Sequence, residues 1–341
     1  MYIKKILVVV SLLGLIVCAF FAYHIYNAIF VTNTAFENDK AIIYITSDAT
    51  FANVLEDIAP LLRDAETFVS VANKKKYSTN VKPGKYEIIK GMNNNDIVNT
   101  LRVNNLPVKV SFNNQEDLES LAGRVATQIE ADSITLVKAF HDSDFLKKSG
   151  FNTDTALGMY IANSYEFFWN TSAEEFRDRM YKEYNRFWSE KRVEKAKKIG
   201  LSKDEVLSLA AIVQKETVKI DERPRVAGVY MNRIDKRMLL QADPTVVYAV
   251  KKDSGKQLKR VLFEHLKISS PYNTYIHIGV PPGPITMPDI SAIDAVLNYE
   301  KHDFLYFVAS TKNMGYHQFA KTLSQHNRNA EAYRRWVAKI H

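Results

Sequence analysis

The N-terminal segment constrains this chain most, because it is apolar over a length that suits a membrane span. Lys4 and Lys5 precede residues 6–26, which are almost entirely apolar. A helix of this length, rising about 1.5 Å per residue, crosses a hydrocarbon core of roughly 30 Å. No cleavage site with small residues follows the segment, so we predict an uncleaved transmembrane anchor at residues 6–26.

The charges that flank this anchor predict its orientation. After the apolar segment, no lysine or arginine occurs before Lys40. The positive-inside rule then makes residues 1–5 a cytoplasmic tail. The rest of the chain would lie outside, on the periplasmic face of the cell (inner) membrane. Cytosolic cofactors are absent there, and the chain has no glycine loop for phosphate, so we expect no cofactor.

Composition argues against several other functions. The one cysteine, Cys18, lies in the apolar segment, so we expect neither a disulfide framework nor a cysteine metal site. His317 and His326 form no His-x-x-x-His pair, and we expect no metal. The formal net charge is +8, but no basic stripe carries interleaved aromatic residues, which argues against nucleic acid as a partner.

Hydrophobic periodicity predicts an α+β fold for the exported part. Residues 41–45 and 85–90 are typical of strands, with two helical segments between them, which gives a small β-α-α-β subdomain at residues 41–105. We expect a connecting helical region at 106–200 and a helix-rich domain at 201–341. Within the last domain, residues 304–310 and 315–321 are predicted to form a β-hairpin, followed by a final helix over 328–340.

Glu216 is the strongest candidate for chemistry on the residues alone. It ends a predicted helix and follows Ile212 and Val213 by four and three residues, so it lies on their apolar stripe. Burial there raises the pKa of a carboxyl group, which suits a general acid that cleaves a glycosidic bond. The alternative is that the helix is already ending, so that Glu216 faces solvent or pairs with Arg223.

Two further segments contain candidate binding residues. Gln241 and Asp243 lie in a turn that can face a cleft, although Asp243 before a proline also matches a helix N-cap. The loop at residues 270–285 holds four of the ten prolines and is expected to be rigid. Polar side chains on such a loop suit sugar hydroxyls and N-acetyl groups, and the alternative is a turn-rich connector. Its candidates are Tyr272, Asn273 and Thr274.

Several long motifs resemble the YceG-like family of endolytic murein transglycosylases. They are IVQKETVKIDERPRVAGVYMNRI, LQADPTVVYAV, SPYNTYIHIGVPPGPI, and FLYFVAS with the later GYHQFAKTLSQHN. Their order and spacing match the family over roughly residues 157–327, and the N-terminal anchor matches it too. The β-α-α-β subdomain resembles the LysM-like subdomain of the family more weakly.

The resemblance implies a membrane-anchored lyase that cleaves peptidoglycan glycan strands internally, between N-acetylmuramic acid and N-acetylglucosamine. The glutamate of the K-E-T motif, here Glu216, would protonate the bridging oxygen. It would then take the proton from the C6 hydroxyl as a 1,6-anhydro ring closes, so one carboxyl group is enough. The family's motifs also make Asn232 a candidate for substrate binding. The peptidoglycan synthases that make the nascent strands are the expected partners.

The chain departs from the family pattern at some positions. Leu157 replaces a common glutamate, and residues 162–164 replace Pro-Asp-Thr. The roles of those residues are therefore not carried over. Two other functions stay open: a muramidase-type hydrolase with Asp243 as its second carboxylate, and a non-catalytic scaffold that binds the wall within the synthesis machinery.

Overall fold

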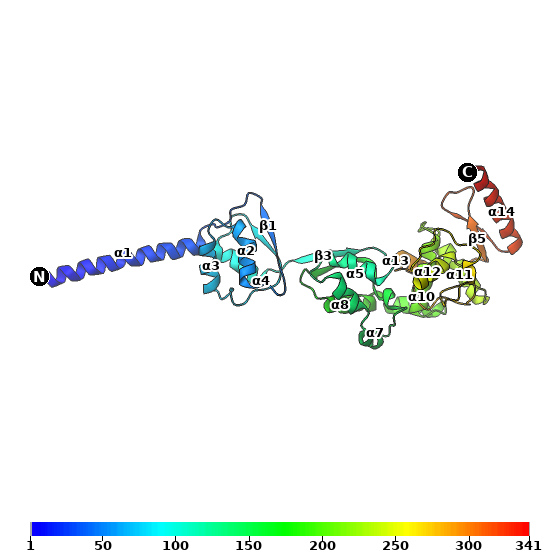
Figure 1. The fold of residues 1–341 in the computed structure, drawn as a ribbon, viewed down its shortest axis with the longest axis horizontal. Coiled ribbons are helices and arrows are strands. Elements are labelled where there is room, and N and C mark those ends of the chain that lie inside the picture. Colours follow the sequence, from blue (N-terminus) through cyan, green and yellow to red (C-terminus); the bar gives the residue numbers. More distant parts are fainter. Residues whose placement is uncertain (1, 341) are drawn as a thin grey trace. The chain divides into compact units, whose positions relative to one another are not determined.

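A computed structural model of the chain describes residues 2–340. Within that range the fold mixes helices with three two-stranded sheets, as predicted, and helices dominate. The chain divides into two compact units, and Figure 1 shows their elements in chain order by colour. The first comprises residues 1–110, 128–131 and 165–172, and the second comprises 111–127, 132–164 and 173–341. Each unit is described separately below.

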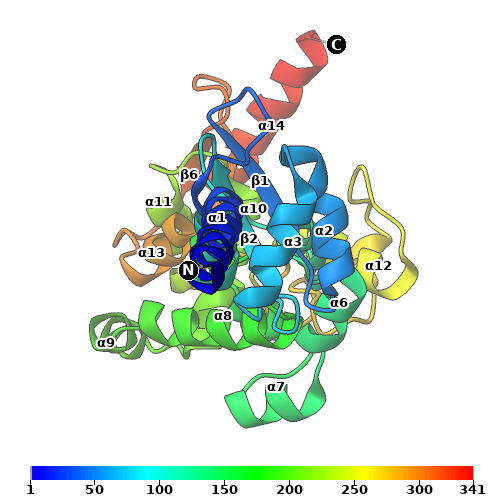
Figure 2. The same ribbon diagram turned by 90° about the vertical axis from the view of Figure 1, so that its left-hand side faces the viewer.

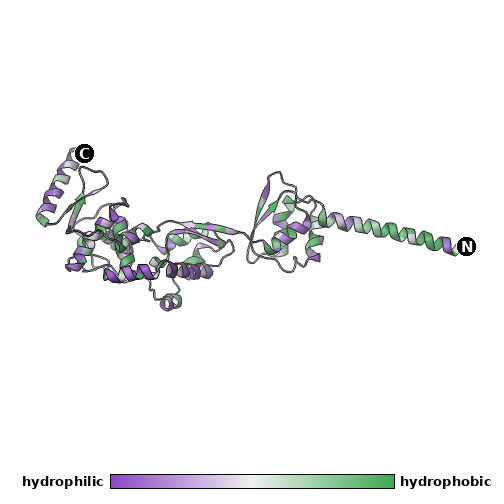
Figure 3. Cartoon of the chain, turned by 180° about the vertical axis from the view of Figure 1, so that it is seen from behind, coloured by the Kyte–Doolittle hydropathy of each residue, from purple (hydrophilic) through white to green (hydrophobic). Residues whose placement is uncertain are grey.

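The first unit begins with one long apolar helix, α1 (Tyr2–Phe30), which is green along nearly its whole length in Figure 3. It is long and apolar enough to cross a membrane, and none of the tested window is buried by the rest of the chain. No other helix within residues 2–340 meets that test. The predicted apolar helix at residues 6–26 is therefore present, with bounds that extend a few residues further on each side.

A small sheet with three helices forms the rest of this unit. Strands β1 (Lys40–Ile45) and β2 (Gly84–Ile89) pair antiparallel, with α2 (Phe51–Ile58) and α3 (Ala65–Lys74) between them in the chain. Helix α4 (Asn94–Val103) follows. Figure 2 shows α2 and α3 side by side next to the sheet. The predicted β-α-α-β order is present because alternate strand residues and one stripe of each helix share a core.

Two more strands lie mostly in the first unit, and a helical cluster belongs to the second. Strand β3 (Pro107–Phe112) pairs with β4 (Asn163–Phe168), and both extend across the boundary of the units. Strand β4 lies in a segment for which the sequence predicts no strand. The helical cluster comprises α5 (Leu118–Ala126), α6 (Ser133–Phe140), α7 (Ser143–Ser149), α8 (Ala173–Phe187) and α9 (Glu190–Lys198).

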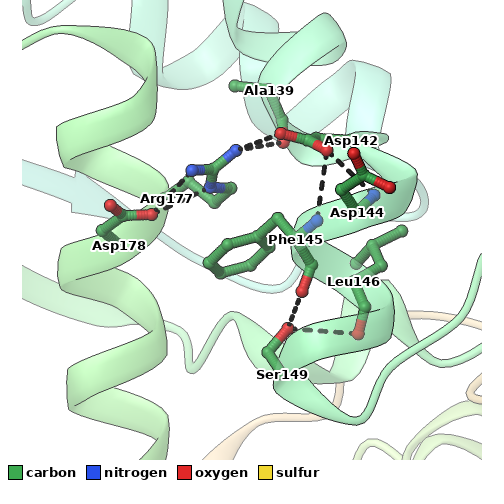
Figure 4. A network of polar contacts seen from close by, with 8 residues as sticks. All are labelled: Ala139, Asp142, Asp144, Phe145, Leu146, Ser149, Arg177 and Asp178. Carbon is green, nitrogen blue, oxygen red and sulfur yellow. Dashed lines mark hydrogen bonds and ion pairs between the residues drawn. The ribbon is translucent and has the colours of Figure 1, made fainter.

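Arg177 of α8 holds α7 in place (Figure 4). Its guanidinium donates to Asp142 at 3.0 Å and to Asp178 at 2.8 Å, and it lies 3.9 Å from the ring centre of Phe145. Asp142 also accepts the first backbone N–H groups of α7, as N-cap residues do. Arg177 thus binds the N-cap residue and an aromatic ring of α7, and Asp178 of its own helix orients the guanidinium.

The C-terminal part of the second unit is organised around one buried helix. Helix α10 (Lys203–Glu216) contacts α9, α11 (Arg223–Asp235), α12 (Asp243–Ser254) and α13 (Ile290–Leu297). Strands β5 (Tyr306–Ala309) and β6 (His317–Ala320) form the predicted hairpin, and α14 (Leu323–Ile340) packs on it. The boundary expected near residue 200 falls inside this unit.

Candidate active site

Helix α10 places Glu216 at the edge of the core. The helix starts at a capping box, which the Ser-x-x-Glu spacing of residues 202–205 predicts: Ser202 accepts from the backbone N–H of Glu205, and the Glu205 carboxylate accepts from that of Ser202. Residues 206–214 are all buried, so the helix is enclosed on every side rather than along one stripe. Glu216 is its last residue, and Thr217 is extended. The carboxylate therefore leaves the core where the helix ends.

Tyr230 of α11 is the hydrogen-bond partner of Glu216. The tyrosine hydroxyl donates to Oε1 of Glu216 at 2.8 Å, and Tyr230 is only 1% exposed. No residue within 2–340 donates to Oε2. The alternative in which Glu216 pairs with Arg223 is wrong, because the Arg223 guanidinium binds both oxygens of Asp289 at 2.8 Å. One carboxyl oxygen is thus fixed, and the other is available to a ligand.

Burial dominates the acidity of Glu216. Desolvation raises its pKa to about 7, and the nearby negative charge of Asp243 raises it as well. The hydrogen bond from Tyr230 and the positive charge of Arg233 act in the opposite direction. A small part of Glu216 still touches solvent because it lines an open pocket, although protein surrounds it on the other sides. A carboxyl group with this pKa can both give and take a proton near neutral pH.

The Arg233 cation lies close to this carboxyl without forming an ion pair. Its guanidinium donates to the backbone carbonyls of Leu239, Leu240 and Leu305, with the shortest two distances at 2.7 Å. These three carbonyls are its hydrogen-bond acceptors, and no carboxylate within residues 2–340 is among them. Neutral carbonyls compensate its burial only partly, so its charge also acts on Glu216.

A pocket of about 380 Å³ opens beside Glu216. Its walls come from the end of α10, from one side of α12 and from three loops, which carry Glu116, Gln257 and Ile285. At its rim, Lys251 donates to Glu116 at 2.8 Å and to Asp117 at 3.2 Å. The lining residues are Glu116, Lys215, Glu216, Asp243, Pro244, Val247, Tyr248, Lys251, Gln257 and Ile285. The pocket therefore combines an apolar wall with several groups that can form hydrogen bonds, as ligand sites do.

Asp243 lies in this pocket for a reason that the sequence did not indicate. The predicted N-cap role is wrong, because Ala242 is the N-cap and Asp243 is the first residue of the helix. Its side chain instead accepts a hydrogen bond from the hydroxyl of Tyr275 at 2.6 Å. Gln241 is exposed and has a left-handed backbone with φ of 51°. It does not line the pocket beside Glu216.

The other predicted binding residues form hydrogen bonds within the protein. Asn273 and Thr274 are buried, and each forms hydrogen bonds with backbone groups of other loop or helix residues. Tyr272 is also buried, and its hydroxyl donates to Asp154 at 3.0 Å. The amide of Asn232 donates to two backbone carbonyls, at residues 302 and 304. None of the four lines the pocket beside Glu216.

The loop at 270–285 contacts the start of α12. Asn273 accepts from the backbone N–H of Tyr275, and Thr274 accepts from that of Ala242. The loop thereby holds the start of α12 and directs Tyr275 to Asp243. Sequence reasoning missed Tyr230, Arg233 and Tyr275, because each acts on a carboxylate that lies far from it in the chain. Within residues 2–340, no three His, Cys, Asp or Glu side chains are grouped so as to hold a metal ion.

The fold and this pocket define a mixed α+β protein with one carboxyl group of raised pKa at the wall of an open pocket. A sequence model of the YceG-like family matches residues 43–332, which is most of the chain. The chain belongs to the YceG-like family.

Relatives of known name support this assignment. The chain is 40% identical over 164 residues to the endolytic murein transglycosylase of Bacillus subtilis (strain 168), a match over 48% of this chain and 44% of that protein. It is 36% identical over 131 residues to the endolytic murein transglycosylase of Streptococcus pneumoniae serotype 2, over 38% of this chain and 24% of that protein. The matches thus span less than half the length of these relatives.

A solved structure also resembles this fold. The crystal structure of a yceG-like protein from Listeria monocytogenes superposes with a TM-score of 0.57 at 27% sequence identity. The superposition covers 86% of this chain and 99% of that chain. It therefore includes both compact units and not the pocket region alone.

Proposed function

We propose that this protein is an endolytic peptidoglycan lytic transglycosylase and that Glu216 is its acid. The observation that carries the proposal is the carboxyl group at the end of α10, which lines an open pocket with its pKa raised to about 7. With this pKa, about half of the Glu216 carboxyl groups carry a proton at pH 7. General-acid cleavage of a glycosidic bond needs such a protonated carboxyl group. The names of the relatives from Bacillus and Streptococcus support murein as the substrate.

The proposed reaction needs one carboxyl group used twice. Protonated Glu216 donates its proton to the oxygen that bridges N-acetylmuramic acid and N-acetylglucosamine. The bond between this oxygen and the muramic C1 then breaks. The ionised carboxylate then accepts the proton of the C6 hydroxyl, whose oxygen bonds to C1 and closes the 1,6-anhydro ring. Tyr230 is placed to stabilise the ionised state between the two steps, because its hydroxyl donates to Oε1. Water is not consumed.

The position of Asp243 favours a second candidate function. It lines the same pocket as Glu216, and hydrolases that cleave glycosides use two carboxylates. In a muramidase, Asp243 would activate water or attack C1. We prefer the transglycosylase because one oxygen of Asp243 is already engaged by Tyr275. The products decide between them, since a hydrolase leaves ordinary reducing ends.

Product analysis tests both the function and the acid. Purified glycan strands are digested with the wild type, with Glu216→Gln and with the control Glu264→Gln, which removes an exposed carboxylate outside the pocket. Mass spectrometry should find anhydro-muramic ends for the wild type and the control and none for Glu216→Gln. Ordinary reducing ends would instead establish the hydrolase.

A non-catalytic scaffold would behave differently in cells. If the protein only binds the wall and organises its synthesis, Glu216→Gln should leave the glycan length distribution unchanged. For the lytic enzyme, we expect longer strands in cells that carry only the Glu216→Gln form. Loss of the whole chain is the reference for both cases.

The remaining parts of the chain fit this role. We propose that residues 41–105 are a LysM-like subdomain for glycan strands, that 106–200 connect it to the catalytic domain at 201–341, and that α1 anchors the protein in the cell membrane. Lys4 and Lys5 favour a cytoplasmic N-terminus, which would expose the pocket to nascent strands and to the synthases that make them. Labelling single cysteines at residues 2 and 264 in a Cys18→Ser background, in intact cells, tests this orientation.

A further inference from the structure

The residue after Glu216 is held more firmly than a helix end requires. Thr217 is 2% exposed, and its hydroxyl donates to Oε2 of Glu222 at 3.1 Å. The same hydroxyl accepts from the backbone N–H of Lys219 at 3.1 Å, and the carbonyl of Thr217 accepts from Arg223 at 3.4 Å. The chain thus turns immediately after the acid and is fixed there by side chains of the following helix.

Glu222 connects this turn to the β5–β6 hairpin. It is 5% exposed and accepts from the backbone N–H of His317 at 2.7 Å and from Nδ1 of the same residue at 2.8 Å. No lysine or arginine within residues 2–340 pairs with it. A buried carboxylate is costly unless hydrogen bonds compensate it, so the bonds from Thr217 and His317 are needed to keep it there.

The hairpin also reaches Glu216 by a second route. Phe307 of β5 packs edge-on against Tyr230 at 5.9 Å between ring centres, and the Tyr230 hydroxyl donates to Glu216. Phe307 lies 5.0 Å from the ring of His317, so the two routes meet within the hairpin. One small sheet therefore supports both the hydrogen-bond partner of the acid and the residue that follows it.

We propose that the β5–β6 hairpin, acting through His317, Glu222 and Thr217, sets the direction of the Glu216 carboxyl group. Glu222 and His317 are then positioning residues for the acid. This inference rests on the proposed function for its kinetic consequences. The positioning itself does not rest on that function, because the contacts of Thr217, Glu222 and His317 hold Glu216 at the pocket wall whatever the reaction.

Matched substitutions separate positioning from simple stability. Thr217→Val keeps the shape and removes the hydroxyl, whereas Thr217→Ser keeps the hydroxyl. His317→Leu removes the donor, whereas His317→Asn keeps an N–H close to Nδ1. For the full chain in detergent, kcat and KM on glycan strands, thermal unfolding and the pH dependence of kcat/KM are measured. Glu222→Gln, of nearly equal volume, adds a variant that can fold if the others do not.

The expected result is a loss in kcat with little change in KM. Thr217→Val and His317→Leu should lower kcat by about 10- to 100-fold, as misplacement of a catalytic group by about 1 Å does, while KM stays within about threefold. Thr217→Ser and His317→Asn should keep most of the activity. A freed Glu216 meets more water, so the high-pH limit of kcat/KM should move to lower pH in the impaired variants only.

The inference is overturned if Thr217→Val and His317→Leu melt earlier but keep kcat and the pH limit, because the contacts are then only structural. Should the wild type make no anhydro ends, the proposed function fails by itself. In that case infrared titration of the carboxyl band that Glu216→Gln removes decides the geometric claim. A lower midpoint in Thr217→Val than in Thr217→Ser supports it, and equal midpoints reject it.

Discussion

The end of α10 and the start of α12 each contribute one carboxylate to the same pocket, and their surroundings differ. Glu216 leaves the core at the C-terminal end of a helix that is buried on all sides. Asp243 is exposed at the N-terminal end of its helix, where the backbone N–H groups favour a negative charge. Burial raises the pKa of Glu216, and the charge of Asp243 adds to that rise.

This difference assigns different work to the two groups. Where the environments of two carboxyl groups diverge, the one in the less polar site is suited to carry the proton. In the proposed reaction, Glu216 is the proton donor, and the negative charge of Asp243 helps to keep the proton on it. Substitutions at Glu216, at Asp243 and at their hydrogen-bond partners should therefore change the reaction in different ways.

The largest expected effect comes from moving the acid. Glu216→Asp keeps the carboxyl group but shortens its side chain by one methylene, so it retreats from both Tyr230 and the substrate. We expect kcat to fall by roughly 100-fold or more, with the protein still folded. Rates of anhydro-end formation on purified strands measure this. Near-normal rates for Glu216→Asp would show that Glu216 does not act at a fixed distance.

Neutralising the second carboxylate should have a smaller effect that depends on pH. Asp243→Asn removes the charge that raises the pKa of Glu216, so that pKa should fall. The acid then loses its proton at lower pH, and the high-pH limit of kcat/KM should move down by about one pH unit. At pH 7.5 the loss should be about tenfold, and at pH 5.5 it should nearly vanish. A loss of more than about 1000-fold at every pH would favour the hydrolase.

Removing the Tyr230 hydroxyl should shift the profile in the other direction. The hydrogen bond from Tyr230 lowers the pKa of Glu216, so Tyr230→Phe should raise it and move the high-pH limit upward. The ring can keep its contact with Phe307, and we expect kcat to fall only a few-fold because the ionised acid loses one donor. A pH profile for Tyr230→Phe that moves down, or not at all, would contradict the opposing roles of the two groups.

Much of the framework around this pair was predictable from the sequence. The capping box at Ser202 and Glu205, the end of α10 at Glu216 and the hairpin near the C-terminus are all present. These features depend on a continuous local pattern: residues three positions apart form the capping box, and the hairpin pairs residues 8 to 14 positions apart across one turn. Local patterns of hydrogen bonding and periodicity are therefore enough to specify them.

The parts that were missed depend on contacts that join distant segments. Tyr230 reaches Glu216 across 14 positions, and Tyr275 reaches Asp243 across 32. No period or spacing marks such pairs. The composition of the proline-rich loop at 270–285 does not indicate which of its side chains point inward. Its polar residues 272–274 are buried, and the side chain that reaches the pocket region is the next one, Tyr275.

The smallest expected effect tests that loop. Tyr275→Phe removes the one hydroxyl that holds Asp243, and burial raises the pKa of Tyr275, so the hydroxyl acts as a neutral donor. A freed Asp243 side chain samples more positions in solvent, and its average effect on Glu216 weakens. The high-pH limit of kcat/KM should therefore move down by a few tenths of a pH unit, in the direction of Asp243→Asn but by less.

Tyr272→Phe is the matched control. It removes a hydroxyl from the same loop, but that hydroxyl donates to Asp154 and not to Asp243. Tyr272→Phe should lower the free energy of unfolding by about 1 kcal/mol and leave the high-pH limit of kcat/KM unchanged. An equal shift in both variants would mean that the loop acts through its general rigidity and not through the contact between Tyr275 and Asp243.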